Sequence, residues 1–392
     1  MCGIIGVYGN TIERNLFKES LSLLDKRGPD NQSYIFVNED IAIGHTRLSI
    51  IDLDAANNQP FVFRHLTLTF NGEIFNYVEL RKELLKEGVE FTTKGDTEVV
   101  LMAYLKWGKT CVKKFNGMWS FVIYDDMNKE FFCSRDRFGI KPFYYTLSQG
   151  IFMFSSEIKP ILNFLPALRN FNYKSIKSYF FLGNSTSLED TWFDDIKKLI
   201  PAHNMVVNKD RNCSISRYWD YPRERKSLSF EDAKGKFRRL FVDAVKLRMR
   251  TDVNFASTIT AGLDSTSIVS VCNTLDAEVL ETYTLYSDNS SFSDLDRSFA
   301  KAQTNLNEAR IVESFKNQLN ILPHLIRLDS ANFVDTLEDV ILRLECGHSS
   351  TATVSAFKLY EEVTKKHKVL LEGQGADEML GGYTALLLPH VI

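Results

Sequence analysis

The chain lacks the paired cysteines that bind metals or build a disulfide framework. Six cysteines occur among its 392 residues, and none of them forms a CxxC pair. It also lacks an apolar run long enough to cross a bilayer, and its first residues, MCGIIGVYGN, show no basic region ahead of an apolar core. We therefore expect a reducing compartment, a cytoplasmic location and no membrane partner.

A strong excess of either charge is absent as well. Lys and Arg total 47 against 50 Asp and Glu, a formal net charge of -3, so nothing indicates a nucleic-acid partner. The basic stretch at 234–250 carries apolar residues at helical spacing, and we interpret it as the solvated face of a helix. The length exceeds what one hydrophobic core usually supports, so we predict two domains, 2–215 and 216–392.

The first domain is predicted to be rich in β-strands. Short apolar runs at 4–8, 66–70 and 121–124 alternate with turn-forming residues. Two helices are expected within it. One follows Asn76, with a capping box to Glu79 and an apolar stripe at Leu80, Leu84 and Leu85; the other covers 97–108.

The second domain is predicted to be a parallel α/β sheet. Strand patterns at 253–260, 281–286 and 369–371 alternate with helical ones, including a helix from about Ser265. Ligands of such sheets bind at the carboxyl ends of the strands, where glycine-rich turns follow 260 and 371 here.

Cys2 directly follows the initiator Met1. Removal of Met1 would place a thiol nucleophile and a free α-amine on one residue, and an α-amine with a pKa of roughly 8 can take the proton from the thiol. A cysteine at this position is weak evidence alone, because a buried bystander is the commoner case. The sequence around it decides the interpretation.

Seven blocks accompany Cys2 in order: CGIIG (2–6), RGPD (27–30), GHTRLSIID (44–52), NGEIFNY (71–77), GDTE (95–98), FNGMWSF (115–121) and RDRFGIKPFYY (135–145). Over roughly 2–190 the chain closely resembles the class II glutamine amidotransferases. The resemblance implies an N-terminal nucleophile αββα glutaminase sandwich. It also implies that Cys2 attacks the glutamine amide and forms a thioester.

The same resemblance implies a glutamine site. Asn71 and Gly72 would supply the oxyanion hole, whose donors stabilise the charge of the tetrahedral intermediate. Arg47 would hold the α-carboxylate and Asp96 the α-ammonium. Assisting residues would be Glu73 and the backbone of Leu48, Ser49, Ile50 and Ile51. A structural alternative stays open, in which Arg47 and Asp96 form a surface salt bridge or a helix cap. For 135–137 a structural role is favoured.

A second constellation lies in TITAGLDSTS (258–267), between a predicted strand and a helix, and in EGQGADEMLGGY (372–383). The first resembles the SGGxDS pyrophosphate loop of asparagine synthetases, and the second their following glycine-rich segment. A small-residue turn that opens a helix presents backbone N–H groups to phosphate. The resemblance implies ATP at Ile259, Thr260, Gly262, Leu263, Asp264, Ser265, Leu285, Glu372 and Gly373, and Mg²⁺ at Asp264 and Asp377.

The synthetase half departs from the family pattern in three ways. Thr260 and Ala261 replace serine and glycine, and the Cβ of Ala261 could crowd the turn. Gln374 stands where many members have a glutamate, and a neutral amide cannot take a proton. The chain ends at Ile392, soon after GGY, so we expect a shortened synthetase domain with an interrupted core element at its end.

The resemblance favours a glutamine-hydrolysing asparagine synthetase that amidates aspartate through an aspartyl-AMP intermediate. Two alternatives stay open: a relative that acts on another carboxylate, and a glutaminase whose synthetase half has degenerated. The expected partners are glutamine, aspartate or another acid, and a second copy in a homodimer, although no interface pattern is visible.

Overall fold

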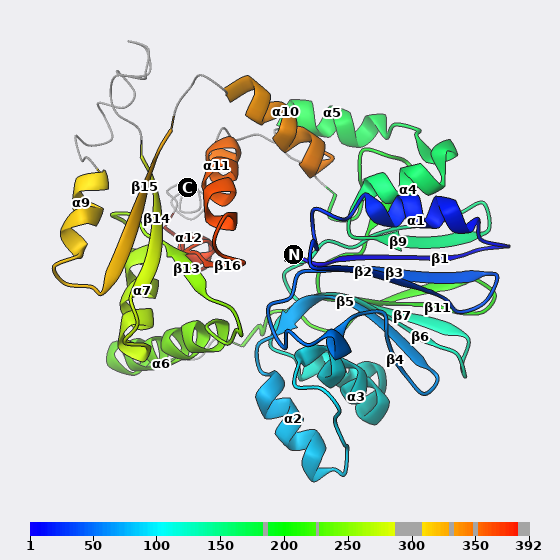
Figure 1. Cartoon of the computed structure of the whole chain (residues 1–392), viewed down its shortest axis with the longest axis horizontal. Coiled ribbons are helices and arrows are strands. Elements are labelled where there is room, and N and C mark those ends of the chain that lie inside the picture. The colour runs from blue at the N-terminus through cyan, green and yellow to red at the C-terminus, as the bar shows by residue number, and fades with distance from the viewer. Residues whose placement is uncertain (183–186, 225–226, 287–307, 329–332, 348–351, 383–392) are drawn as a thin grey trace. The chain divides into compact units, whose positions relative to one another are not determined.

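The computed structural model describes residues 1–182, 187–224, 227–286, 308–328, 333–347 and 352–382. The chain forms two compact units, one of Met1–Arg225 with Leu344–Ser349 and the other of Lys226–Arg343 with Ser350–Ile392 (Figure 1). A division after residue 215 would fall inside strand β12 (Cys213–Arg217), which pairs with β11 (His203–Val207). The described residues contain no helix long and apolar enough to cross a bilayer.

The first unit contains two stacked six-stranded sheets (Figure 1). All the strand pairs recorded in them are antiparallel. The first sheet, in spatial order, has β10 (Lys197–Lys198), β8 (Tyr144–Ser148), β9 (Ile151–Ser155), β1 (Gly3–Tyr8), β3 (Ile41–Arg47) and β2 (Asn31–Phe36). The second has β12, β11, β7 (Glu130–Arg135), β6 (Gly117–Asp125), β5 (Leu66–Ile74) and β4 (Phe61–Phe63).

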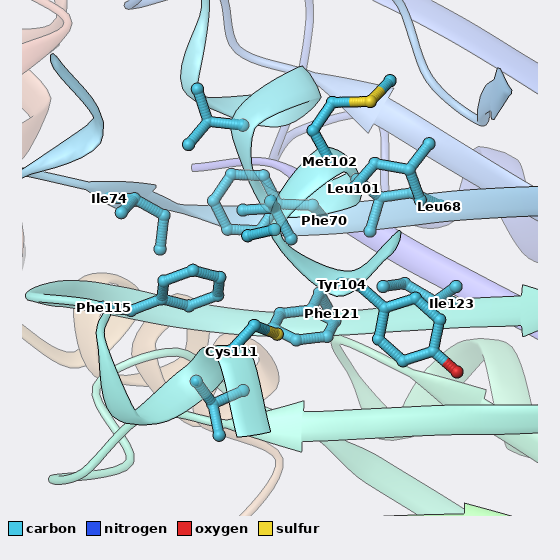
Figure 2. Close-up of a cluster of buried hydrophobic side chains, with 14 of the residues drawn as sticks. Leu68, Phe70, Ile74, Leu101, Met102, Tyr104, Cys111, Phe115, Phe121 and Ile123 are labelled. Atoms are coloured by element: carbon cyan, nitrogen blue, oxygen red, sulfur yellow. The ribbon is translucent and has the colours of Figure 1, made fainter. Parts of the chain in front are cut away.

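Helices cover the outer faces of both sheets. Side chains of α1 (Arg14–Ser22) and α4 (Ile158–Phe164) pack on the first sheet. Side chains of α2 (Tyr77–Lys86) and α3 (Asp96–Trp107) pack on the second, where Phe70, Leu101 and Phe121 lie in one buried cluster (Figure 2). The remaining helical segments are α5 (Tyr173–Leu182) and the short η1 (Ala55–Asn57), η2 (Gly108–Lys113) and η3 (Pro166–Leu168).

A third cluster, which includes Ile4, Ile43, Val122 and Phe154, fills the space between the two sheets. Strands covered on both faces read as continuous apolar runs rather than as alternating ones. This explains GIIGVY in β1, which is buried along nearly its whole length. The predicted αββα sandwich is confirmed.

The predicted helices of this unit form, with two corrections. The capping box is wrong: Asn76 makes no side-chain cap bond to α2, because its amide instead accepts from Asn116 N and donates to Lys114 O. Leu85 is 52% exposed and does not belong to the buried stripe of Leu80 and Leu84. The structure also adds α1, which we did not expect.

The second unit contains a four-stranded parallel sheet, so the predicted parallel α/β architecture is confirmed. Its strands, in spatial order, are β15 (Ile321–Arg327), β14 (Leu280–Tyr286), β13 (Phe255–Thr258) and β16 (Val369–Leu371). Side chains of α6 (Phe230–Arg248), α7 (Leu263–Leu275) and α9 (Glu308–Phe315) share one core cluster with the sheet. Side chains of α11 (Ala352–Thr364) share another. The other helices among the described residues of this unit are α10 (Phe333–Leu344) and α12 (Ala376–Leu380). The end segment 383–392 lies outside the described residues.

Candidate functional site

Cys2 lies at the start of β1, which pairs with β3 so that Gly3 is opposite Thr46. Its Sγ is 3.4 Å from Leu48 N, which donates to it, and 3.7 Å from Leu48 O. The Arg27 side chain donates from Nε to the Cys2 carbonyl at 3.0 Å and from Nη1 to Glu157 at 3.1 Å. Burial raises the pKa of the Cys2 thiol, although the bond from Leu48 opposes the shift. The resting thiol therefore keeps its proton and needs a base.

The chain-start amine lies in a desolvated environment beside this thiol. In the unprocessed chain the amine belongs to Met1, and burial lowers its pKa to about 6. The neighbouring cations of Lys141 and Arg27 lower the pKa further, while the electrostatic contributions of Cys2 and Glu73 oppose the shift. The Met1 amine of the unprocessed chain is therefore largely neutral at pH 7.

Arg47 ends β3 and is only 5% exposed. Its Nη1 donates to Asp54 O and to Asn58 Oδ1, both at 2.8 Å, and its Nη2 donates to Asp52 O. The loop after β3, which begins with 48–51, therefore fixes the plane of the guanidinium. The surface salt bridge with Asp96 is wrong, because both side chains are buried and no ion pair joins them among the described residues.

Asn71 and Gly72 lie in β5, opposite Ser120 and Trp119 of β6. Asn71 is 1% exposed, and its Nδ2 has no hydrogen-bond acceptor within the described structure. A Cβ on Gly72 would lie 2.3 Å from Met118 O, so only glycine fits at this position. The site thus holds an unused amide donor beside a strand position where the backbone comes unusually close to its neighbour.

Asp96 is the first residue of α3 and is 5% exposed. Its Oδ2 accepts from Ile74 N, at the end of β5, at 2.9 Å. Burial, and then the charge of Glu73, raise the pKa of Asp96 to about 7, although the bond from Ile74 opposes the shift. Near neutral pH this carboxyl is therefore divided between its two protonation states.

The turn before Asp96 is held by Glu98, which is 1% exposed. Its carboxylate accepts from the backbone N–H and the hydroxyl of both Thr92 and Thr93, at distances of 2.7 to 3.1 Å. This set of bonds explains why GDTE forms a rigid turn ahead of α3.

We expect Glu98→Ala to lower the free energy of unfolding by about 3 kcal/mol, because it leaves several donors without acceptors. Thermal and urea unfolding measure the effect. Glu90→Ala, at an exposed position in the same connection, is the matched control and should change stability little. Equal stability of the two variants would contradict the assignment.

The segment 135–141 places a lysine near the Cys2 site, Lys141, which the sequence analysis did not predict as a site residue. Arg135 donates to the carbonyls of Lys141, Leu199 and Gly139, and the Asp136 carboxylate accepts from the N–H groups of Phe138, Ile140, Lys141 and Trp119. The structural role favoured for this segment therefore fits. Lys141 is 5% exposed, and it interacts electrostatically with Glu73 and Cys2 while burial lowers its pKa. Its position inside IKP gave no sign of this burial.

In the second unit, the turn between β13 and α7 is organised by hydroxyl groups. Thr260 N donates to Ser265 Oγ at 3.0 Å, the two hydroxyls lie 2.9 Å apart, and Gly262 N donates to Thr260 Oγ1 at 3.0 Å. Ala261 N donates to Glu308 Oε1 at 3.2 Å, so an acidic side chain already accepts from one backbone N–H of this turn. Phosphate binding to this N–H would require Glu308 to move.

A pocket of about 330 Å³ lies at this turn. Its lining residues come from both glycine-rich segments: Thr258, Thr260, Gly262, Asp264, Ser265, Glu372, Gly373, Gln374, Gly375, Asp377 and Glu378. Most of the residues predicted for ATP and Mg²⁺ are thus brought together. Three are not among its lining: Ile259 is fully buried in the core, Leu263 is 79% exposed, and Leu285 packs near α11.

The two segments touch directly, since a Cβ on Gly373 would lie 3.2 Å from Asp264 Cβ and from Ser265 N. Four carboxylate side chains make the pocket acidic: Asp264, Glu372, Asp377 and Glu378. Phosphates would be repelled there unless a cation lay between. The described residues contain no group of three or more His, Cys, Asp or Glu that could hold a metal alone. Mg²⁺ needs only one or two carboxylates when phosphates complete its shell, so this donor set fits it.

Comparison with known proteins agrees with both halves of this description. Residues 1–219 match the family described as glutamine amidotransferase domain, and residues 236–392 match the family described as asparagine synthase. The chain belongs to the glutamine-hydrolysing asparagine synthetase family. It is 31% identical to asparagine synthetase [glutamine-hydrolyzing] 3 of Bacillus subtilis, over 98% of this chain and 63% of that protein.

Two further proteins are similar to this chain. The putative asparagine synthetase [glutamine-hydrolyzing] 2 of Methanocaldococcus jannaschii is 32% identical over 98% of this chain and 76% of its own length. A protein named amidase chry2 from Gibberella zeae is 29% identical over 93% of this chain and 55% of its own. This synthetase-family chain thus spans between about half and three quarters of these relatives' lengths.

Proposed function

We propose that this chain hydrolyses glutamine at Cys2 and uses the ammonia to amidate a carboxylate that ATP activates in the second unit. The observation that carries the proposal is the buried, unused Nδ2 donor of Asn71, next to Gly72, in the same unit as the Cys2 thiol. A donor without an acceptor costs free energy in the folded protein. An oxyanion that forms during the reaction would satisfy it.

In the first half-reaction, the α-amine of processed Cys2 takes the thiol proton as Sγ attacks the side-chain carbonyl of glutamine. Asn71 Nδ2 and Gly72 N–H donate to the oxyanion. The tetrahedral intermediate expels ammonia with the proton from the amine, and water then cleaves the thioester to glutamate. Arg47 and Asp96 hold the α-carboxylate and α-ammonium, with Glu73 and the 48–51 backbone beside them.

In the second half-reaction, an acceptor carboxylate oxygen attacks the α-phosphorus of ATP and releases pyrophosphate. Ammonia then attacks the acyl-adenylate carbon and releases AMP. Thr260, Gly262 and Ser265 would contact the phosphates, and Asp264 and Asp377 would hold Mg²⁺, which neutralises phosphate charge when bound. Three further residues are proposed to contact ATP, either through their backbone atoms or at the adenine: Ile259, Leu263 and Leu285.

We propose aspartate as the acceptor, with asparagine as product. A second candidate is a different acid, because Gln374 lines the pocket as a neutral amide and a relative is named an amidase. Mass spectrometry of products from amide-¹⁵N glutamine, ATP-Mg²⁺ and single acids distinguishes them. Labelled asparagine with AMP and pyrophosphate supports aspartate; glutamate and ammonia alone, whichever acid is supplied, would refute the coupled reaction.

Asp264→Asn is expected to lower pyrophosphate formation by about ten- to a hundredfold, because one anionic ligand of Mg²⁺ is lost. Glutamine hydrolysis should be unchanged in the same variant. Asp276→Asn is the matched control, because Asp276 is exposed and lies at the other end of α7. Unaltered pyrophosphate formation by Asp264→Asn would remove this residue from the site.

The pKa of about 7 for Asp96 predicts a pH dependence of glutamine binding. The ammonium of glutamine needs the ionised carboxylate, whose fraction rises from about a tenth at pH 6 to about nine tenths at pH 8. We expect kcat/KM for glutamine, divided by that for glutaramate, which has no α-ammonium, to rise up to about tenfold over this range. The ratio cancels titration of the catalytic amine. A flat ratio would contradict the role of Asp96.

A further inference from the structure

Asn57 has a buried side-chain amide that nothing in the described structure satisfies. It ends η1 and is 2% exposed, and neither its Oδ1 nor its Nδ2 has a hydrogen-bond partner. A buried amide without partners is unfavourable, and native proteins rarely retain one without a reason. The roles assigned above leave Asn57 unexplained.

The amide packs against the residue before Asp96, in a loop that also contacts Arg47. A Cβ on Gly95 would be 2.9 Å from both Oδ1 and Nδ2, and Gly95 directly precedes Asp96. On the other side, the neighbouring Asn58 accepts from Arg47 Nη1 at 2.8 Å. The Asn57 amide thus contacts Gly95, one residue before Asp96, and the next residue along the chain bonds to Arg47.

The loop that carries Asn57 is fixed in place. Asp54 Oδ1 accepts from Ala56 N at 2.8 Å, and Asp54 O accepts from Asn57 N at 3.1 Å. Asp52 Oδ2 accepts from Lys94 N at 2.6 Å, which ties the loop to the turn before α3. The amide is consequently held in position before any ligand arrives, as a recognition group should be.

We propose that Asn57 is a further glutamine-binding residue whose Oδ1 accepts a hydrogen bond from the α-ammonium. This inference rests on the proposed glutaminase function. An ammonium has three donors. One carboxylate seldom accepts from all three, and Ile74 N takes part of the acceptor capacity of Asp96. A neutral acceptor beside Asp96 adds a bond without adding a second buried charge. This acceptor would also favour glutamine over substrate amides that lack an α-amino group, because those amides would leave Asn57 Oδ1 without a hydrogen bond.

Asn57→Ala and Asn57→Leu test the proposal in the whole chain, with L-glutamine and glutaramate as substrates. We expect both variants to raise KM for L-glutamine by about tenfold, with little change in kcat or in KM for glutaramate. A merely structural amide predicts something else for Asn57→Leu, because replacing an unpaired buried amide by an apolar group of similar size should preserve or raise stability and leave KM unchanged.

Unchanged KM for L-glutamine in both variants, or an equal rise for both substrates, would overturn the assignment. If Asn57→Ala is destabilised by the cavity that it leaves, the substrate ratio of Asn57→Leu decides. Failure of the glutaminase function itself is distinguishable, because the unsubstituted chain would then not hydrolyse L-glutamine at all.

Discussion

Replacing Cys2 with alanine is expected to reduce glutamine hydrolysis by roughly 10⁴- to 10⁶-fold, the range typical for loss of a catalytic nucleophile. The Cys2 Sγ is the only atom of the site proposed to form a covalent bond with the substrate. Leu48 N donates to this sulfur, and Arg27 donates to the Cys2 carbonyl. No neighbouring group can replace the thiol. Glutamate formation under saturating glutamine measures the effect.

Two comparisons make this result specific. Cys213→Ala removes an exposed cysteine from β12 and should hydrolyse glutamine normally. Cys2→Ala should retain its unfolding temperature, because a small, half-buried side chain is lost without a large cavity. Hydrolysis by Cys2→Ala within tenfold of the unsubstituted chain would refute the nucleophile assignment.

Gly72→Ala is expected to lower kcat for glutamine hydrolysis by about 10²- to 10³-fold, the effect of losing an oxyanion-hole donor. The added Cβ would lie 2.3 Å from Met118 O and 2.8 Å from Trp119 Cα, so β5 and β6 must move apart where the donor is needed. This displacement should also lower the free energy of unfolding by about 2 kcal/mol.

Steady-state kinetics and urea unfolding separate these two effects. Gly9→Ala is a matched control in the same unit, because its Cβ would meet only the flexible Ile151 side chain, at 3.3 Å. It should retain activity. A Gly72→Ala variant that keeps the kcat of the unsubstituted chain would show that the backbone at this position does not contribute to the reaction.

Local patterns in the sequence were sufficient to predict the sheet and helix layers of both units. The apolar run at 4–8 predicted a strand, and the structure has β1 there, buried along nearly its whole length. The pattern at 97–108 predicted α3 to within one residue. Contacts between distant segments were not predictable in this way. Asn76 has cap chemistry, but its amide bonds to Lys114 and Asn116, which only the folded chain brings near.

The same limit applies to the sites. Motif order indicated Cys2, Asn71 and Asp96, since each stands in a distinctive block. Burial of Lys141 and isolation of the Asn57 amide depend on tertiary packing, which no spacing rule describes. The contact of Ala261 with Glu308 likewise joins residues 47 positions apart.

Intact-mass and N-terminal peptide mass spectrometry of the active protein, combined with kcat for glutamine, test the central claim most directly. The account predicts that Met1 is absent, that residue two carries a free amine, and that an electrophilic glutamine analogue forms a single adduct on Cys2 as activity is lost. Full glutaminase activity in chains that retain Met1, or that are acetylated at residue two, would contradict it.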